Sequence, residues 1–410
     1  MERVVVTGMG VASPLGCTVA DFWAGLLEGR SGIVELQDEL IAKQRSHIGG
    51  VVSGFDALEY FGRKGAHRMS RSSHLAIVAA DQAVAQAGLN DGIVDKQEVG
   101  VLISSSNGGY AASDPFFRDF YARGTFNPFT IPIVMNVGPS SNISIKYGFK
   151  GPLINLDAAC SSAAHAVGYG YYLIRSGQLD VALTGAADTP LSPGVVAAWC
   201  ALRALSERND SPAQACRPFS ADRDGLVLGE GAGVLILESE TSALRRGRPI
   251  LAEVIGYGAS GDGHHLTQPA VDGPVRAMRK ALNSAALSPD DIDYINAHGT
   301  GTQWNDKTET AAIKEVFGER AYRIPVVSNK AALGHSIAAS GALELIGGIL
   351  SLRDQVLPPT INYTTPDPEC DLDYVTEGRR PHAIRTIMSN SFAFGGSNGV
   401  LVVRKYESSP

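Results

Sequence analysis

Short apolar runs that end in glycine or polar residues recur along the chain. The runs 3–11, 99–104 and 181–186 each have the length of a single strand and are rich in β-branched or small apolar residues. Between them lie stretches with small and apolar residues at helical spacing, at 20–28 and 72–87. The proline-containing stretch 127–140 is expected to be irregular. This alternation predicts an α/β protein in which helices cover mixed sheets.

The order of elements starts again near residue 251. Ala252-Glu-Val-Ile-Gly-Tyr-Gly258 repeats the pattern of Val4-Val-Val-Thr-Gly-Met-Gly10, and further strands are expected at 386–391 and 400–404. The loop 296–302 takes the place of 101–109, and 324–335 leads into a small-residue helix as 152–160 does. We therefore predict an internal duplication into halves 1–250 and 251–410, whose equivalent loops converge on one site.

A cysteine lies where an expected buried strand, 152–156, gives way to an expected helix, 161–175. Free N–H groups and the positive end of the helix dipole at such a junction favour a thiolate over a thiol. The small residues on both sides of Cys160 leave its sulfur open to approach. The alternative is that Cys160 is a small buried hydrophobe, as most intracellular cysteines are.

Composition narrows the class of protein. The chain has 410 residues, 44% of them hydrophobic and 19% charged, with a net charge of −7, which argues against general nucleic-acid binding. Its five cysteines form no CxxC pair and have no metal-ligand spacing, so we expect no metal and a reducing compartment. The N-terminus does not read as a signal peptide, and the apolar stretch 337–352 contains Glu344. These features predict a cytoplasmic protein that does not span a membrane.

Five motifs in fixed order carry a resemblance to a known family. They are Asp157-Ala-Ala-Cys-Ser-Ser162, Gly229-Glu-Gly-Ala-Gly233, Asn296-Ala-His-Gly-Thr-Gly-Thr302 with Asn305-Asp306, Ser328-Asn-Lys-Ala-Ala-Leu-Gly-His335 and Asn390-Ser-Phe-Ala-Phe-Gly-Gly-Ser-Asn398. Together they resemble β-ketoacyl-acyl carrier protein synthases, and the elongating synthase II group most. The resemblance implies a thiolase fold, an α/β fold with a duplicated αβαβα five-layer arrangement. Its N-terminal half would carry the nucleophile and its C-terminal half the two histidines.

The resemblance also implies a reaction, in which an acyl group held on a cysteine is extended by decarboxylative Claisen condensation with a malonyl thioester. A thiolate takes the acyl group, and neutral imidazoles stabilise the enolate oxygen. By resemblance, Cys160 is the nucleophile, His298 and His335 form the decarboxylation pair, and Lys330 supports them. The N–H groups of Cys160 and Phe394 would form the oxyanion hole. Glu309, Asp306 and Glu344 would support this network.

The same resemblance also implies which residues bind the substrate and its carrier. We expect Thr300, Thr302, Thr267, Phe392, Ala393 and Asn107 to bind substrate, and no cofactor beyond the phosphopantetheine arm that the acyl carrier protein brings. The basic cluster Arg63, Lys64, His67 and Arg68, with Arg203, would dock that acidic carrier, although such a cluster can also be a solvated helix end. A homodimer is expected, or a heterodimer with a chain-length-factor-like subunit.

Two departures and three competitors shape this interpretation. Ala393 stands where elongating synthases usually have glycine, and Asn107 where synthase II usually has an apolar residue at the acyl pocket. Because an unpaired amide facing hydrocarbon is costly, Asn107 suggests an unusual acyl chain, which the product lengths of Asn107→Ile would test.

A thiolase would carry a second cysteine near Ser391, a starter-type synthase would lack His335, and a chain-length factor would lack Cys160. The catalytic half of a synthase and chain-length-factor heterodimer in polyketide or polyene biosynthesis remains the alternative.

Overall fold

The computed structural model describes residues 1–408 and has one large mixed sheet of nine strands. The strands follow the order β4-β5-β6-β1-β7-β13-β12-β8-β9 across the sheet. Their bounds are β1 Val4–Ala12, β4 Val99–Ser104, β5 Val181–Asp188, β6 Gly231–Ser239, β7 Ala252–Gly261, β8 Tyr294–Asn296, β9 Val326–Val327, β12 Thr386–Phe392 and β13 Ser397–Arg404. Two small two-stranded sheets pair β2 Ile33–Glu35 with β3 Ile48–Gly50 and β10 Val356–Leu357 with β11 Arg380–Pro381.

The pairing pattern of the large sheet is itself duplicated. In the first half, β4 and β5 are parallel, and β5–β6 and β6–β1 are antiparallel. In the second half, β8 and β12 are parallel, and β12–β13 and β13–β7 are antiparallel. The halves meet where β1 pairs with β7 over Val4–Val6. The internal duplication that the sequence predicts is therefore present in the sheet topology.

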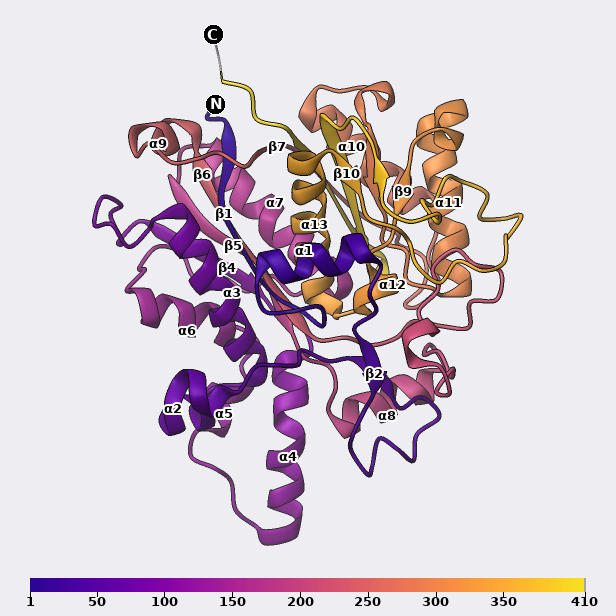
Figure 1. Cartoon of the computed structure of the whole chain (residues 1–410). Helices are drawn as coiled ribbons and strands as arrows, with labels where there is room; N and C mark the ends of the chain where they lie inside the picture. Colours follow the sequence, from indigo (N-terminus) through magenta and orange to yellow (C-terminus); the bar gives the residue numbers. More distant parts are fainter. Residues whose placement is uncertain (409–410) are drawn as a thin grey trace.

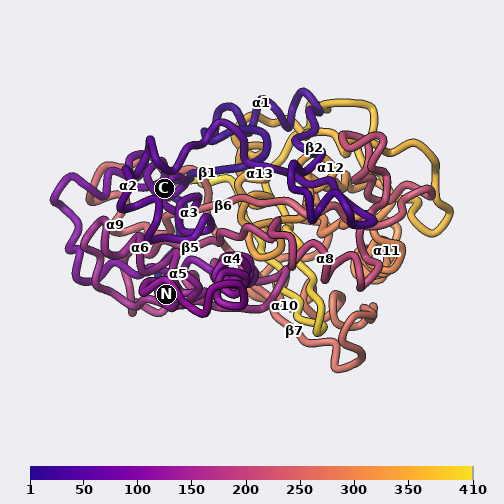
Figure 2. Tube along the Cα trace, turned by 90° about the horizontal axis from the view of Figure 1, so that it is seen from below, coloured from indigo at the N-terminus to yellow at the C-terminus, as the bar shows by residue number. Residues whose placement is uncertain are grey.

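The longer helices form three layers around the two half-sheets (Figures 1 and 2). Helix α3 packs on β1 and β6, and α10 packs on β7 and β13, so each covers an outer face. Helices α7 and α13 contact each other and strands of both halves, and form the central layer. This is the expected five-layer αβαβα arrangement. The longer helices are α1 Val19–Glu28, α2 Ala57–Arg68, α3 Arg71–Ala87, α4 Gly108–Arg123, α6 Gly138–Tyr147, α7 Ser162–Arg175, α8 Pro193–Leu202, α10 Asp272–Ala285, α11 Gln303–Phe317 and α13 Ser340–Asp354; the shorter ones are α5 Thr130–Val134, α9 Glu240–Arg245 and α12 Lys330–Leu333.

Equivalent glycines let an outer helix lie directly on the strand in each half. A Cβ added at Gly10 would lie 1.9 Å from the carbonyl oxygen of Ala79 in α3. A Cβ at Gly258 would lie 2.1 Å from the carbonyl oxygen of Ala277 in α10. The repeated Gly-x-Gly pattern therefore serves helix–strand packing in both halves.

The structure corrects two sequence-based expectations. Residues 152–156 do not form a buried strand: Leu153 makes only an isolated bridge to Val101 and is 38% exposed. This segment flanks the edge strand β4, as β9 flanks β8 in the other half, and only one side of it is paired within the chain. The stretch 127–140, expected to be irregular, contains α5 and the start of α6, and the protruding helix α4 ahead of it was not predicted at all (Figure 1).

Two kinds of site are absent from the part of the chain that the structure describes. No helix within residues 1–408 is long and apolar enough to cross a membrane. The same residues contain no group of three or more histidine, cysteine, aspartate or glutamate side chains placed to hold a metal ion.

Candidate active site

Cys160 lies in a sharp turn at the start of the central helix α7. It is the middle residue of a 3-10 turn, Ala159–Ser161, and α7 begins at Ser162. Ala159, directly before it, has a φ of 48°, a left-handed conformation that costs a non-glycine residue about 1 kcal/mol or more. Such strain persists only where the surroundings hold the backbone, and here it lies directly before Cys160.

The environment of the Cys160 sulfur combines opposing effects. Burial raises the pKa of the thiol to about 12, whereas the charge of Lys330 and hydrogen bonds from the backbone N–H groups of Phe394 and of Cys160 itself lower it. The effect of burial on the pKa of Cys160 is the larger one. The substrate-free enzyme therefore holds a thiol rather than the thiolate that the helix dipole alone would favour. The same two N–H groups are the pair expected to form an oxyanion hole.

His298 follows strand β8 and is held from two sides. Its backbone N–H donates to Glu309 at 2.8 Å, as does the N–H of Gly299. On the ring side, the ammonium Nζ of Lys330 lies 3.3 Å from His298 Nδ1 and also donates to the His298 carbonyl at 2.5 Å. Because an ammonium group can only donate, Nδ1 must accept and the ring proton resides on Nε2.

His335 faces His298 across the site, with their ring centroids 5.4 Å apart and their planes at 83°. Its Nδ1 lies 2.8 Å from the hydroxyl of Ser340 in the first turn of α13. That hydroxyl accepts the N–H of Ser336 and lies 3.3 Å from the Ser336 hydroxyl, so its own hydrogen can point to Nδ1 or to Ser336. When it points to Nδ1, the proton of His335 also resides on Nε2, a buried atom without a partner among residues 1–408.

Both imidazoles are neutral at neutral pH. Burial lowers the pKa of His298 and of His335 well below 6.5, and the charge of Lys330 lowers both further. Two uncharged rings whose proton resides on Nε2 can donate hydrogen bonds to one oxygen as negative charge develops on it. This is the arrangement that decarboxylation of a carboxylated thioester requires.

A layer of buried carboxyl groups lies behind the histidines. Glu344 pairs with Lys330 at 2.5 Å, and both side chains are 1% exposed. Burial raises the pKa of Glu309 to about 7, although three hydrogen bonds oppose this shift. Asp306 accepts the N–H groups of Phe219 and Gly301 and so holds the loop that follows His298. All three carboxyl groups therefore lie where support of the site was expected.

Phe394 occupies a tight turn between β12 and β13. Its ring stacks on Trp199 with centroids 5.6 Å apart. The turn is tied to the loop after β7, because Gly395 donates to the Leu266 carbonyl and Asp262 donates to the Gly396 carbonyl. Ala393 has an extended backbone, φ −134° and ψ 155°, so alanine introduces no strain at this position.

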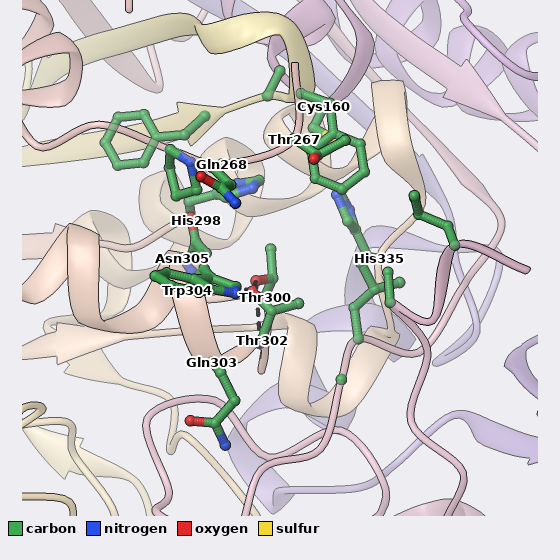
Figure 3. A pocket seen from close by; sticks show the side chains of 18 of the residues that line it. Cys160, Thr267, Gln268, His298, Thr300, Thr302, Gln303, Trp304, Asn305 and His335 are labelled. Carbon is green, nitrogen blue, oxygen red and sulfur yellow. Dashed lines mark hydrogen bonds between the residues drawn. The ribbon is translucent and has the colours of Figure 1, made fainter. Parts of the chain in front are cut away.

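One pocket of about 400 Å³ unites most of the expected site residues. Cys160, His298 and His335 line it together with Thr300, Thr302 and Thr267 (Figure 3). Further expected residues that line it are Phe392, Ala393, Phe394 and Arg203. The two halves of the chain thus supply one site, as the duplication predicts.

Other expected residues lie apart from this pocket. Asn107 is not among the residues that line it, and its backbone N–H donates to the buried carboxylate of Asp188. The cluster Arg63, Lys64, His67 and Arg68 is exposed on α2 and lies apart from Arg203, on the other side of α4 (Figures 1 and 2). The structure therefore does not bring the α2 cluster and Arg203 together within one chain.

Three residues with a part in the site were missed in the sequence. Ser340 forms a hydrogen bond with Nδ1 of His335, Trp199 stacks on Phe394, and Asp188 accepts N–H groups from Asn107 and Ala338. Their partners are far from them in sequence or belong to irregular backbone, so no local pattern marks them. Of these three residues only Asp188 could have been found, because a carboxyl group at the end of a buried strand is unusual and indicates a function.

Comparisons with known proteins agree with this geometry. Residues 1–243 match the family description "Beta-ketoacyl synthase, N-terminal domain" and residues 251–364 match "Beta-ketoacyl synthase, C-terminal domain". A curated relative, 3-oxoacyl-[acyl-carrier-protein] synthase 2 of Synechocystis sp., is 41% identical over 410 residues, which are 99% of each chain.

Two solved structures share the fold over 99% of this chain and 100% of theirs. One is described as the ishigamide ketosynthase/chain length factor, with 35% identity and a TM-score of 0.92. The other is a type II polyketide synthase acyl-carrier protein in complex with its ketosynthase, with 33% identity and a TM-score of 0.91.

The chain belongs to the β-ketoacyl synthase family. Its expected thiolase fold and its class, a condensing acyltransferase that resembles the synthase II group, are confirmed.

Replacement of Ser340 by alanine tests the tautomer assignment. Ser340→Ala frees His335 to carry its proton on Nδ1, so malonyl decarboxylation should slow by roughly tenfold or more. Acylation of Cys160, which does not need that proton, should stay within about twofold of the parent and is the internal control. Release of carbon dioxide and the mass of the protein measure the two steps. Equal loss of both steps, or of neither, would contradict the assignment.

Proposed function

We propose that the protein is a β-ketoacyl-acyl carrier protein synthase that extends an acyl chain held on Cys160 by decarboxylative condensation with malonyl carrier protein. One observation carries this proposal: two buried neutral imidazoles, each with Nδ1 bound from behind, face the same pocket as a cysteine at the start of a helix. The resemblance of the motifs and of the relative from Synechocystis supports it.

The first step transfers the acyl group to the enzyme. The Cys160 sulfur attacks the carbonyl carbon of the acyl thioester, and the oxygen that becomes negative accepts hydrogen bonds from the N–H groups of Cys160 and Phe394. The bond to the carrier sulfur then breaks, and the carrier leaves as a thiol with the proton that Cys160 held. Because burial raises the pKa of Cys160, the sulfur keeps this proton in the substrate-free enzyme and gives it up during the attack on the thioester.

The second step generates the carbon nucleophile. The bond between the malonyl α-carbon and its carboxylate breaks, carbon dioxide leaves, and the electron pair becomes an enolate. The enolate oxygen accepts hydrogen bonds from the Nε2–H groups of His298 and His335. Since both rings are neutral, they stabilise the developing charge without first giving up a proton to the malonyl carboxylate.

The third step forms the product. The enolate carbon attacks the acyl carbonyl on Cys160, the carbon–sulfur bond breaks, and the Cys160 thiolate that leaves takes up one proton from water. The product is a β-ketoacyl chain, two carbons longer, on the second carrier. No redox change and no metal takes part in this scheme, and the phosphopantetheine arm comes with the substrate.

Intact-mass measurement tests the proposal directly. Incubation with acyl carrier protein substrates should add one acyl group to the enzyme, and Cys160→Ala should abolish this addition. Malonyl carrier should then remove the acyl group and yield an extended product on the carrier. Acylation without extension would contradict elongation, and absence of acylation would place the chain with non-catalytic members of the family.

Carrier docking is part of the proposal, and the relative described as an acyl-carrier protein complex with its ketosynthase supports it. We propose that the exposed cations of α2 bind an acidic carrier, and that Arg203, which lies apart from them at the pocket, is a separate contact for it. None of the acidic residues within 1–408 forms a salt bridge with Arg63, Lys64, Arg68 or Arg203.

Charge reversal tests this docking surface. Lys64→Glu with Arg68→Glu should raise the KM for carrier-bound substrate by roughly tenfold at low ionic strength, because repulsion replaces attraction. The KM for an acyl thioester of free pantetheine should not change, since that substrate has no carrier surface. Identical kinetics with carrier-bound substrate would refute the surface.

We further propose that the protein is a cytoplasmic dimer. Large apolar side chains are exposed in and beside α4 and α5, among them Tyr110 at 71%, Tyr121 at 81% and Ile131 at 70%. Such a surface is typical of a subunit interface. The relative described as a ketosynthase/chain length factor supports the alternative, in which a homologous subunit covers this surface. Native mass of the chain expressed alone distinguishes them, because only a homodimer forms without the homologue.

A further inference from the structure

A chain of four hydrogen-bonded side chains leads to the turn that holds Cys160. His165, in the first turn of α7, lies between two hydroxyl groups. Its Nδ1 is 2.5 Å from the hydroxyl of Tyr257, and its Nε2 is 2.9 Å from the hydroxyl of Ser397. The hydroxyl of Ser397 is hydrogen-bonded in turn to that of Ser161, at 3.1 Å. The chain therefore begins on β7 and ends on the residue that directly follows Cys160.

The bond between the two serines joins the two turns whose N–H groups face the Cys160 sulfur. Ser397 is the first residue of β13, and its carbonyl accepts the N–H of Ala393 at 2.9 Å, which closes the turn that contains Phe394. Ser161 is the last residue of the other turn, in which Cys160 is the middle residue. The distance between the two turns, and so between their N–H groups, is therefore coupled to the position of Ser397.

The far end of the chain is held by packing. Tyr257 is 8% exposed, and its ring meets the imidazole of His165 edge-on, with centroids 6.0 Å apart and planes at 86°. A Cβ added at Gly168 would lie 2.5 Å from the Tyr257 ring, so this ring rests directly on the backbone of α7. The imidazole is therefore fixed at the place from which it reaches Ser397.

The chain carries no charge at neutral pH. Burial lowers the pKa of His165, and it raises the pKa of the Tyr257 hydroxyl, so both groups are neutral. A neutral imidazole has one donor and one acceptor, and can therefore bind both hydroxyl groups at once. The effect of the chain on the site is one of position and not of charge.

We propose that His165 is a positioning residue for acyl transfer. Through the two serines it holds the turns of Phe394 and Cys160 together, so that both backbone N–H groups reach the same oxyanion. The inference rests on the proposed function, in which acylation and condensation both place negative charge on that oxygen. Decarboxylation places the charge instead on an oxygen bound by His298 and His335. His165 therefore acts on acyl transfer and not on the release of carbon dioxide.

Two substitutions separate the two hydrogen bonds of the imidazole. The amide of glutamine reaches the place of Nε2 and can bind Ser397, whereas the shorter asparagine reaches only the place of Nδ1. His165→Gln should keep the kcat of Cys160 acylation by a hexanoyl carrier protein within about threefold of the parent. His165→Asn should lower this kcat by roughly tenfold or more, with KM within about twofold. Intact mass at short reaction times measures both.

A second position tests the chain as a unit. Ser397→Ala removes the middle link and should lower the acylation kcat as His165→Asn does. The double variant should be no slower than the slower single variant, because either change alone already breaks the chain. Losses that multiply in the double variant would contradict a shared role.

Three controls accompany these variants. Release of carbon dioxide from malonyl carrier protein by the unacylated enzyme should stay within about twofold of the parent. Alkylation of Cys160 by iodoacetamide, followed on its peptide, forms no oxyanion and should also stay within about twofold. His382→Asn is the matched control, since His382 is another partly buried histidine, hydrogen-bonded to the carbonyl of Asp293. It should leave acylation unchanged.

The outcomes distinguish positioning from other roles. A loss of acylation that alkylation shares would mean that His165 acts on the sulfur itself. A loss that decarboxylation shares would mean a general disturbance of the site. Parent-like acylation in His165→Asn would mean that the chain has no part in acyl transfer. Each of these results overturns the proposal.

Amide hydrogen exchange tests the coupling of the turns without any reaction. Peptides that cover 158–164 and 392–398 should exchange faster in His165→Asn than in the parent, and at the parent rate in His165→Gln. Unchanged exchange in His165→Asn would contradict the positioning role. Because this measurement needs no acyl group, a parent enzyme that is not acylated would refute the proposed function alone.

Discussion

The buried ion pair between Lys330 and Glu344 is the interaction on which the rest of the site depends. Both side chains are 1% exposed, so the removal of one partner would leave an uncompensated buried charge, which typically costs about 3–5 kcal/mol. The ammonium group has three donors, and they reach Glu344 Oε1, the carbonyl of His298 and the Nδ1 of His298. One group therefore places His298, fixes its tautomer, and lowers the pKa of both histidines and of Cys160.

The duplicated fold explains how three distant segments reach this pair. Lys330 and His335 precede the central helix α13, just as Cys160 precedes its neighbour α7. His298 follows β8, which pairs with β12 as β4 pairs with β5. The active site lies where these equivalent loops of the two halves meet, so its geometry is a consequence of the duplication.

Much of this could be predicted from the sequence, because local patterns carry it. The repeated strand pattern that ends in Gly-x-Gly predicted the duplication. The five motifs predicted that Cys160, His298, Lys330, His335 and Phe394 belong to one site. The prediction of a strand at 152–156 was wrong, because an apolar run does not show whether other segments of the same chain pair with it. Helix α4 was missed since its apolar side chains face outward and give no amphipathic pattern directed at a core.

Other features depend on contacts that no single sequence displays. Ser340 is one serine among many until its hydroxyl is seen beside His335, and the stacking of Trp199 on Phe394 joins residues nearly two hundred positions apart. The balance of effects at Cys160 could not be read from its position at a helix start either. Only the structure shows that Cys160 is buried, which raises its pKa and keeps the side chain a thiol before the substrate binds.

The pH dependence of malonyl decarboxylation tests the central claim most directly. The pKa values of His298 and His335 are lowered, so both rings stay neutral as the pH falls through 6.5, and they lose their role only when they are protonated at still lower pH. Within the window from about pH 8 to about pH 6, the rate constant with saturating malonyl carrier should therefore change only with the supporting carboxyl of Glu309, whose pKa is about 7, and it should be flat in Glu309→Gln. A decline centred near 6.5 in Glu309→Gln, the value of an ordinary imidazole, would contradict the account.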